Sequence, residues 1–400
     1  MEAVSEHGVV IAGNQETFDD VTKGLTLFEN GDVLFAKITP CMENGKGAYV
    51  ETLPTRYAFG STEFHVMRPS REIDGKFLYY VTFNPFFRSW AEKNMHGAAG
   101  QQRVPTRFLK YTGLPLPPLP EQKRIAAYLD LSCAAIDRAV DTKQQQLETL
   151  DALRKSIITP AVLSGLDQSR PMQNTGNVWL ASIPVGWKLV ALKRVSETQT
   201  GITLGKTYEP PLIERPYLRA ANVQDGYLDL EKITTIEIPG VLATRYELQS
   251  GDVLMTEGGD LDKLGRGFPW EGQIEGCLHQ NHVFAIRTNP RLLLSKFLAY
   301  VTASRYGRDY FEATGKRTTN LASTNSTKVG LFPIPLPRVQ EQQIIVDHID
   351  EKLEQARQVE ATITSQISTL TAYRKSLIHE CVTGKRRITD ADVAKVEAHV

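Results

Sequence analysis

The feature that most constrains this chain is an internal repeat with an offset of 220 residues. GDVL at Gly31–Leu34 recurs at Gly251–Leu254, and RKS at Arg154–Ser156 recurs at Arg374–Ser376. Because one offset brings such widely separated segments into register, we interpret the chain as a duplication that folds into two similar modules. Further matches at this offset are Gly45–Gly47 with Gly265–Gly267, Phe64 with Phe284, Lys76–Thr82 with Lys296–Thr302, Arg88 with Arg308, Pro115–Pro117 with Pro335–Pro337, and Glu121–Gln122 with Glu341–Gln342.

Each copy divides into a mixed segment and a long helix. The mixed segment has short apolar strands, glycine turns and short helical stretches, which indicates an α/β domain. A proline-rich hinge follows at Leu114–Gln122 in the first copy and Ile334–Gln342 in the second. Proline ends the preceding structure and is tolerated at a helix start, so we predict helices over about 121–164 and 341–384.

The two predicted helices carry a narrow heptad stripe of apolar residues. A stripe this narrow favours a partner helix over a broad core, so we expect the two helices to pack on each other. The alternative, in which each helix packs on its own mixed segment, stays open. At 1.5 Å per residue such helices are about 66 Å long, long enough to act as a ruler between two modules. The predicted seam residues are Leu129, Ile136, Leu147, Leu150, Ile157, Ile349, Leu353, Ile363, Leu370 and Leu377.

Composition places the chain among soluble globular proteins. Lys+Arg and Asp+Glu both total 46, so a global basic field is absent and any nucleic-acid contact must come from local patches. No apolar run approaches the roughly 18–20 residues that span a bilayer, so we expect no membrane association. The four cysteines show no paired spacing, which favours reduced thiols in a cytoplasmic protein.

Three near-motifs for catalysis or metal binding are incomplete. Gly201–Thr207 has one residue too few between its glycines for an ATP phosphate loop. Asn84–Phe87 lacks the second proline of the amino-methyltransferase motif, and a helix-breaking turn is favoured. Cys277, His279 and His282 have no second ligand pair nearby, which disfavours a zinc site. We therefore predict no catalytic residue, metal or cofactor in this chain.

The loops before the two hinges are rich in glycine, amide and basic residues, at His96–Phe108 and Thr314–Lys328. Gln and Asn pair with adenine, Arg pairs with guanine, and Lys contacts phosphates. These loops and the basic glycine turns are therefore candidate DNA-reading elements, although ordinary solvated loops remain an equal alternative. The candidate DNA-binding residues are Lys46, Gln101, Gln102, Arg103, Lys206, Arg266, Lys316, Arg317 and Asn320.

Four segments resemble the specificity subunits of type I restriction–modification systems. They are the hinge and helix start LPLPPLPEQKRIAAYLD, the helix ends LRKSIITPAVLSG and YRKSLIHECVTGK, and PYLRAANVQDGYLDLEKI at Pro216–Ile233. The resemblance implies tandem α/β target-recognition domains separated by two helices in an antiparallel coiled coil. It also implies a non-catalytic subunit that binds a bipartite, asymmetric site in double-stranded DNA. The implied partners are two methyltransferase subunits and motor-nuclease subunits, which would hold S-adenosylmethionine, ATP and Mg.

The expected domain boundaries follow from the repeat and the resemblance. We expect recognition domain one at 1–118, helix one at 119–165, a linker at 166–177, recognition domain two at 178–337, helix two at 338–386 and a tail at 387–400. Met1 aligns with Ala221, so the first copy has no counterpart of about 178–220, and we expect its head to be truncated. A second hypothesis is therefore a degenerate adaptor that binds methyltransferase without specific DNA reading.

Overall fold

The computed structural model describes residues 2–5, 8, 10–11, 13, 24–98, 100–259, 264–265, 267–317 and 322–398. The chain forms two compact units, residues 1–146 with 362–400 (unit 1) and residues 147–361 (unit 2). Each unit contains one part of both long helices, α5 (Leu119–Ser164) and α10 (Val339–Val382). Within the described residues, no helix combines the length and apolarity needed to cross a membrane.

Unit 1 is built on a small antiparallel sheet in the order β3–β2–β5, with a separate two-stranded antiparallel sheet of β1 and β4. The central strand β2 is buried on both faces, as its sequence VLFA requires. Its neighbours and helices are β1 (Leu25–Glu29), β2 (Val33–Ala36), β3 (Gly47–Tyr49), β4 (Tyr57–Ser61), β5 (Phe64–Met67), α2 (Gly75–Phe83), α3 (Pro85–Lys93) and α4 (Thr106–Tyr111).

In unit 1, the first part of α5 pairs with the last part of α10. Arg374 of α10 forms an ion pair with Asp137 of α5, with Nε and Oδ1 2.9 Å apart. Leu129, Ile136 and Leu377 belong to one buried cluster with side chains of α2 and α3. The helices therefore pack both on each other and on the α/β segment, so the two arrangements that the heptad pattern left open occur together.

The C-terminal residues of unit 1 include a further helix. α11 (Asp390–Glu397) begins at Thr389, whose side chain accepts a hydrogen bond from the Asp392 N–H while Asp392 caps in return. Ile388 is buried in the unit 1 core, and Val393 and Val396 pack against that core. The segment expected to be a tail, 387–400, thus contains the helix α11.

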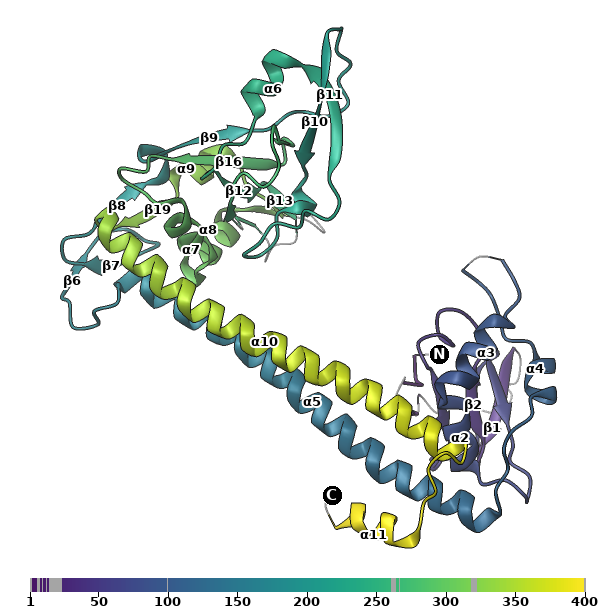
Figure 1. The fold of residues 1–400 in the computed structure, drawn as a ribbon. Helices are drawn as coiled ribbons and strands as arrows, with labels where there is room; N and C mark the ends of the chain where they lie inside the picture. Colours follow the sequence, from purple (N-terminus) through teal and green to yellow (C-terminus); the bar gives the residue numbers. More distant parts are fainter. Residues whose placement is uncertain are drawn as a thin grey trace. The chain divides into compact units, whose positions relative to one another are not determined.

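Unit 2 has the same plan with more strands (Figure 1). Its central sheet has the order β14–β12–β16–β9, and β12 again has a fully buried sequence, VLMT. Its elements besides α5 and α10 are β6 (Met172–Asn174), β7 (Ser182–Pro184), β8 (Lys188–Ala191), η1 (Leu192–Arg194), β9 (Ser196–Thr200), β10 (Leu212–Leu218), η2 (Ala220–Asn222), β11 (Thr234–Pro239), α6 (Gly240–Tyr246), β12 (Val253–Thr256), β13 (Gly258–Gly259), β14 (Gly267–Pro269), β15 (Leu278–His279), β16 (Val283–Thr288), α7 (Ser295–Ala303), α8 (Arg305–Thr314), β17 (Lys316–Arg317), β18 (Ala322–Ser323), α9 (Ser326–Leu331) and β19 (Pro333–Leu336).

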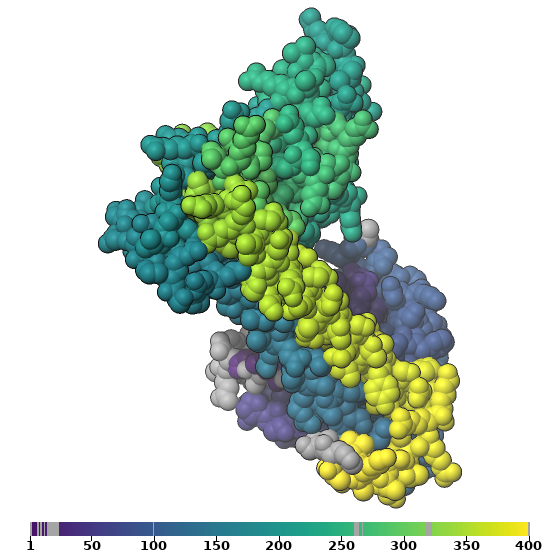
Figure 2. Space-filling view, turned by 60° about the vertical axis from the view of Figure 1, so that its left-hand side comes forward, coloured from purple at the N-terminus to yellow at the C-terminus, as the bar shows by residue number. Residues whose placement is uncertain are grey.

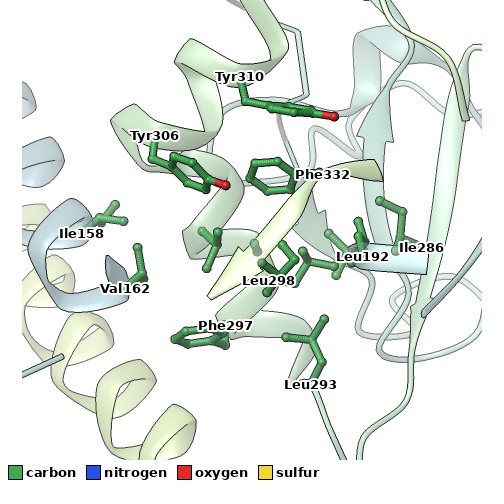
Figure 3. Packing of buried hydrophobic residues seen from close by; sticks show 14 of the residues in the cluster. Ile158, Val162, Leu192, Ile286, Leu293, Phe297, Leu298, Tyr306, Tyr310 and Phe332 are labelled. Carbon is green, nitrogen blue, oxygen red and sulfur yellow. The ribbon is translucent and has the colours of Figure 1, made fainter. Parts of the chain in front are cut away.

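The main core of unit 2 lies between α7, α8 and the central sheet, and both long helices pack onto it. Figure 3 shows Tyr306 and Tyr310 of α8 beside Phe332, with Ile158 and Val162 of α5 facing them. The rings of Tyr306 and Phe332 are stacked, with centroids 5.3 Å apart. Arg154 of α5 also forms an ion pair with Glu360 of α10, so the helices pair in this unit too.

The repeat is visible in the bonding of the two units. In unit 1, Asp32 accepts two hydrogen bonds from the Arg68 guanidinium, and in unit 2 Asp252 accepts two from Arg287. Lys76 and Tyr80 both bind Asp130, and their counterparts Lys296 and Tyr300 both bind Asp350. The duplicated residues therefore form duplicated ion pairs, and the tandem α/β fold with paired helices is confirmed.

The offset of 220 holds for most of the repeat, but it shifts by one residue at one strand. Ala36 lies opposite Phe64 in the first sheet, and the corresponding Thr256 lies opposite Val283 in the second. Phe64 is thus equivalent to Val283, and the expected match of Phe64 with Phe284 is wrong by one residue. The offset is restored at Lys76 and Lys296, because the connections before and after this strand differ in length by one residue.

Candidate DNA-reading loops and the helix pair

In unit 1, the predicted reading loop is folded back on itself and held by a neighbouring turn. Arg103 exchanges two backbone hydrogen bonds with His96, closing the loop between them. Thr39 binds Gln102 twice, because its N–H donates to the Gln102 carbonyl and its hydroxyl accepts from the Gln102 N–H. Gln101 lies exposed at the loop end. The loop is thus a fixed element of the surface.

Lys46 belongs to the turn that supports this loop. Its N–H donates to the Cys41 carbonyl, and its own carbonyl accepts from the Ala36 N–H. The same turn contains Thr39, the partner of Gln102. The structure therefore brings Lys46, Gln101, Gln102 and Arg103 into one region, as expected for a shared surface.

The Arg103 side chain has a partner within unit 1. Its guanidinium donates two hydrogen bonds to the Glu63 carboxylate, at 2.9 and 2.8 Å. This hydrogen bonding lowers the pKa of Glu63 and raises that of Arg103, so the pair stays charged on both sides. Glu63 was not anticipated from the sequence, because a single acidic residue in a turn gives no signal of its partner. The Arg103 side chain therefore helps to hold the loop in place through its bonds to Glu63.

In unit 2, the predicted reading loop rests on a small sheet in the order β13–β18–β17. Lys316 pairs with Ser323, and Ser323 pairs with Gly258 on its other side. Lys316 is exposed at the start of β17. For Arg317 the structure describes the backbone position in β17, whereas Asn320 and Arg266 lie outside the described residues.

Lys206 lies on a separate loop between β9 and β10. Hydrogen bonds join this loop to residues 279–281, just before β16. Ile202 binds His279 and Asn281, since its N–H donates to the His279 carbonyl and its carbonyl accepts from the Asn281 N–H. Gly201 permits this contact, because a Cβ there would lie 2.0 Å from the His279 carbonyl oxygen. Lys206 itself is exposed.

The turn that contains His282 links this loop to the small sheet. Glu257 donates its N–H to the His282 carbonyl and accepts from the Thr324 N–H, which follows β18. The Glu257 carboxylate also lies 2.7 Å from the His282 ring Nδ1. Glu257 and His282 are thus surface residues of the candidate reading region, and the sequence interpretation considered His282 only as a metal ligand.

The other two candidate ligands of this segment, Cys277 and His279, are buried. His279 is fully buried, its Nδ1 is 2.7 Å from the Val283 carbonyl, and burial lowers its pKa. Burial also raises the pKa of the Cys277 thiol to about 12, so the thiol stays protonated at neutral pH. No cluster of three metal-ligating side chains occurs among the described residues.

The other two near-motifs serve as turns. Asn84 ends α2 and caps α3 by accepting a hydrogen bond from the Phe86 N–H. Its side chain also lies 3.1 Å from Nδ1 of His379 on α10, which ties the turn to the helix pair. The glycine loop at Gly201 continues into β10 and not into a helix, so the helix N-terminus that a phosphate loop uses is missing from it.

The predicted seam residues are all buried or half-buried in their own units. Leu129, Ile136, Ile349, Leu353, Ile363 and Leu377 are buried. Leu147, Leu150, Ile157 and Leu370 are half-buried. The heptad pattern therefore identified the inward face of each helix.

Both helices also carry exposed apolar residues on other faces. Leu153 on α5 and Tyr373 on α10 occupy equivalent positions of the repeat and are each about half exposed. Ile344 and Val359 are exposed on α10, and Figure 2 shows α10, drawn yellow-green to yellow, at the molecular surface. Exposed apolar residues along a helix are available for contacts with a partner protein.

Unit 2 contains a cavity of about 1120 Å³ between α7, α8 and the helix pair. Ala299 and Ala303 line it, and their counterparts in unit 1 are Tyr79 and Phe83. The two aromatic rings are buried there, with centroids 4.5 Å apart. The two copies thus share their framework, but small alanine side chains line a cavity in unit 2 where aromatic side chains are buried in unit 1.

Comparison with known proteins shows similarity to one group of proteins. Residues 13–151 match the type I restriction modification DNA specificity domain. The chain is 38% identical over 161 residues to the type I restriction enzyme EcoAI specificity subunit of Escherichia coli, which is 40% of this chain and 26% of that protein. It is 24% identical over 345 residues to the StySPI specificity subunit of Salmonella potsdam, covering 85% and 71%. The chain is thus similar to the specificity subunits of type I restriction enzymes, and residues 13–151 carry the match to the DNA specificity domain.

Solved structures show the same fold. One comes from work on complex assembly and conformational transition of a type I restriction–modification system. It has a TM-score of 0.71 at 19% identity and covers 95% of this chain and 89% of its own. The HsdS subunit of Thermoanaerobacter tengcongensis has a TM-score of 0.52 at 18% identity and covers 96% and 89%. The alignments to the EcoAI and EcoEI subunits span about a quarter of those proteins' length, 26% each.

Proposed function

We propose that this specificity-subunit homologue is the DNA sequence-recognition and scaffold subunit of a type I restriction–modification complex. It binds a bipartite, asymmetric site in double-stranded DNA, one half through the loops of each unit. The helix pair docks two methyltransferase subunits, and motor-nuclease subunits join that core. The chain is non-catalytic in this proposal, and S-adenosylmethionine, ATP and Mg belong to the partner subunits in the cytoplasm.

One observation carries this proposal: the two units share a framework but differ in their candidate reading loops. The Asp32–Arg68 and Asp252–Arg287 pairs hold the same sheet in each unit. The loops that leave this framework carry Gln101 and Gln102 in unit 1 and Lys316 in unit 2. Equal scaffolds with unequal loop chemistry suit two half-sites of different sequence, because base identity is read by side chains on fixed loops.

The mechanism needs only binding steps from this chain. Exposed lysines such as Lys206 and Lys316 contact phosphates and set the register on the duplex, while amide side chains reach base edges. Each phosphate contact releases a counterion, so binding falls as salt rises. Adenine methylation or DNA cleavage is then carried out by the docked partners.

The test uses the chain co-purified with its methyltransferase subunits. Methylation-site sequencing of DNA from cells that express the complex should give one bipartite motif. Fluorescence anisotropy on a duplex with that motif should show about 10³-fold or tighter binding than on a shuffled duplex at the same salt. A complex that assembles but binds both duplexes equally would favour the adaptor without DNA reading.

A further inference from the structure

The cavity of unit 2 is lined by two small side chains at positions where unit 1 has large ones. Ala299 and Ala303 of α7 correspond to Tyr79 and Phe83 of α2 at the offset of 220. The correspondence is residue for residue, because α2 and α7 have the same length and begin 220 residues apart. The two alanines therefore open space that buried aromatic rings occupy in unit 1.

One position at the cavity has opposite charge in the two copies. In unit 1, Asp137 of α5 forms an ion pair with Arg374 of α10. The counterparts of these residues in unit 2 are Arg357 and Arg154, and both line the cavity. The Arg154 guanidinium is paired with the Glu360 carboxylate. A carboxylate of unit 1 is thus replaced by a second guanidinium at the wall of the unit 2 cavity.

The charges around the cavity are positive in sum. Of the described residues that line it, six are basic and three are acidic. Lys155, Arg305 and Arg357 come from three different helices, and their side chains are each more than half exposed. Each forms an ion pair with an acidic residue three or four positions away on its own helix, and exposed pairs of this kind contribute little to stability. These three side chains can therefore turn toward an anion at small cost.

The walls between these charges are apolar and aromatic. Ile158 and Leu353 of the helix pair are buried there, and Phe268 of β14 and Tyr300 of α7 add aromatic rings. Tyr227, in the loop after η2, also lines the cavity and is 56% exposed. The volume of about 1120 Å³ is just above the range of roughly 300–1,000 Å³ that is typical of small-molecule sites. An apolar body that carries a negative charge matches both kinds of surface.

We propose that the cavity of unit 2 binds a small amphipathic organic anion, with an apolar body and one acidic group. The body packs against Phe268 and the two alanines, and the acidic group accepts hydrogen bonds from Arg357 and Lys155. A ligand in this place contacts both long helices, α7 and β14 at once, so it stabilises unit 2. Lys206 and Lys316 of the candidate reading loops do not line the cavity, and the site goes beyond DNA reading and subunit docking.

The shape and the walls favour a small molecule over a macromolecule. Duplex DNA would bring phosphates to the basic side chains, but phosphates would leave the apolar walls uncovered. A polypeptide partner that binds as a helix or a strand needs an extended groove or a sheet edge. Residues of α5, α7, α8, α10 and β14 instead wall this space on several sides.

The test uses the full chain and the probe 8-anilinonaphthalene-1-sulfonate, which joins an aromatic body to one sulfonate. Fluorescence titration should show saturable binding to one site per chain, with a Kd of about 10–100 µM for a molecule of this size. Hydroxyl-radical labelling read by mass spectrometry should show that the probe protects Tyr227 over the same concentration range. Ala299→Tyr combined with Ala303→Phe installs the unit 1 side chains and should abolish both signals. Ala152→Phe, on the exposed face of α5, is the matched control and should bind as the wild type does.

A charge reversal keeps the proposal testable if the filled variant does not fold. Arg357→Asp installs the unit 1 charge at an exposed position and should weaken binding of the sulfonate probe about tenfold or more. The uncharged analogue N-phenyl-1-naphthylamine should bind this variant and the wild type equally. Arg291→Asp reverses an exposed charge outside the cavity and should change neither affinity.

Saturable protection of Tyr227 that Arg357→Asp weakens and Arg291→Asp does not supports the proposal. The proposal is overturned if the probe leaves Tyr227 unprotected, if the folded double-alanine replacement binds as tightly as the wild type, or if both charge reversals have equal effects. It is also overturned if duplex DNA or the methyltransferase subunits protect Tyr227 and the probe does not, because the cavity is then part of a macromolecular contact.

Discussion

Gln342 offers the sharpest test of how the long helix is fixed to unit 2. Its side chain is fully buried at the start of α10. The side-chain oxygen accepts from the Leu294 N–H at 2.8 Å, and the amide nitrogen donates to the carbonyls of Leu292 and Pro337 at 2.8 and 2.9 Å. Gln342→Ala removes all three bonds at once.

The size of the effect follows from the groups left behind. One N–H and two carbonyls would lose their partners in a buried place, and each such group costs about 1–3 kcal/mol. Because water can enter part of the space, we expect a combined loss of about 3–5 kcal/mol in the free energy of unfolding of unit 2. The equivalent Gln122 makes the same three kinds of bond in unit 1, so Gln122→Ala should destabilise unit 1 by a similar amount.

Tryptophan fluorescence during urea unfolding separates the two units. Trp179, Trp187 and Trp270 lie in unit 2, and Trp90 lies in unit 1. With a urea dependence of about 2–3 kcal/mol per molar, Gln342→Ala should lower the midpoint of the main fluorescence transition by about 1–2 M. Gln122→Ala should leave that transition nearly unchanged.

The neighbouring Gln343→Ala is the matched control. Gln343 is exposed on the same turn of α10, and among the described residues its side chain binds Asp347, four residues further along the helix. Its replacement should move the midpoint by no more than about 0.2 M. If Gln342→Ala and Gln343→Ala give the same midpoint, the buried amide does not fix the helix, and the reasoning from buried hydrogen bonds fails here.

Three further predictions concern DNA binding, helix pairing and pH. Replacing both Lys316 and Arg317 by Ala should weaken DNA binding by the methyltransferase complex without loss of assembly. The steepness of log affinity against log salt concentration should fall by about 2, because two phosphate contacts are lost. Unchanged affinity, or an equal loss of affinity in Arg291→Ala, would rule out a role of this loop in DNA binding. Leu150→Asp or Leu370→Asp places a charge in the helix seam, so helicity should be lost at lower temperature and methyltransferase should no longer co-purify. Ala152→Asp and Ala372→Asp, on the exposed face, should have neither effect. A complex that still assembles with both seam changes would contradict the helix pairing. Burial holds the pKa of His279 below its ordinary 6.5, so below about pH 6.5 the unfolded chain binds a proton that native His279 does not, and stability should fall as pH drops from 7 to 5. His279→Gln should flatten this slope in urea midpoints measured across that range, and an unaltered slope would show that other groups cause it.

Much of the architecture could be predicted from the sequence because it depends on local and periodic signals. The offset of 220 identified the duplication, and the prolines before Gln122 and Gln342 marked the helix starts. The heptad stripe identified the inward face of both helices, including Leu129 and Leu377. Apolar periodicity is a property of neighbouring residues on one element, so it survives without knowledge of the fold.

Other features depended on contacts between residues far apart in the chain. Arg154 and Arg374 each have an acidic partner on the opposite helix, Glu360 and Asp137, and the sequence pattern does not indicate these pairs. The sequence likewise contained no indication that the Arg103 guanidinium binds Glu63. A charged side chain carries no local signal of which distant partner will neutralise it.

The sequence by itself determined that the chain is two copies of one plan with paired helical faces, because duplication and heptad period are written in residue order. Only the tertiary structure decided which charged residues support loops and where the copies differ. Phe86 and Tyr306 occupy the same place in the repeat, yet one is exposed and the other buried. The physical reason is that burial depends on what packs over a residue, and in unit 2 that cover comes from Trp179–Val195, more than 100 residues before Tyr306 in the chain.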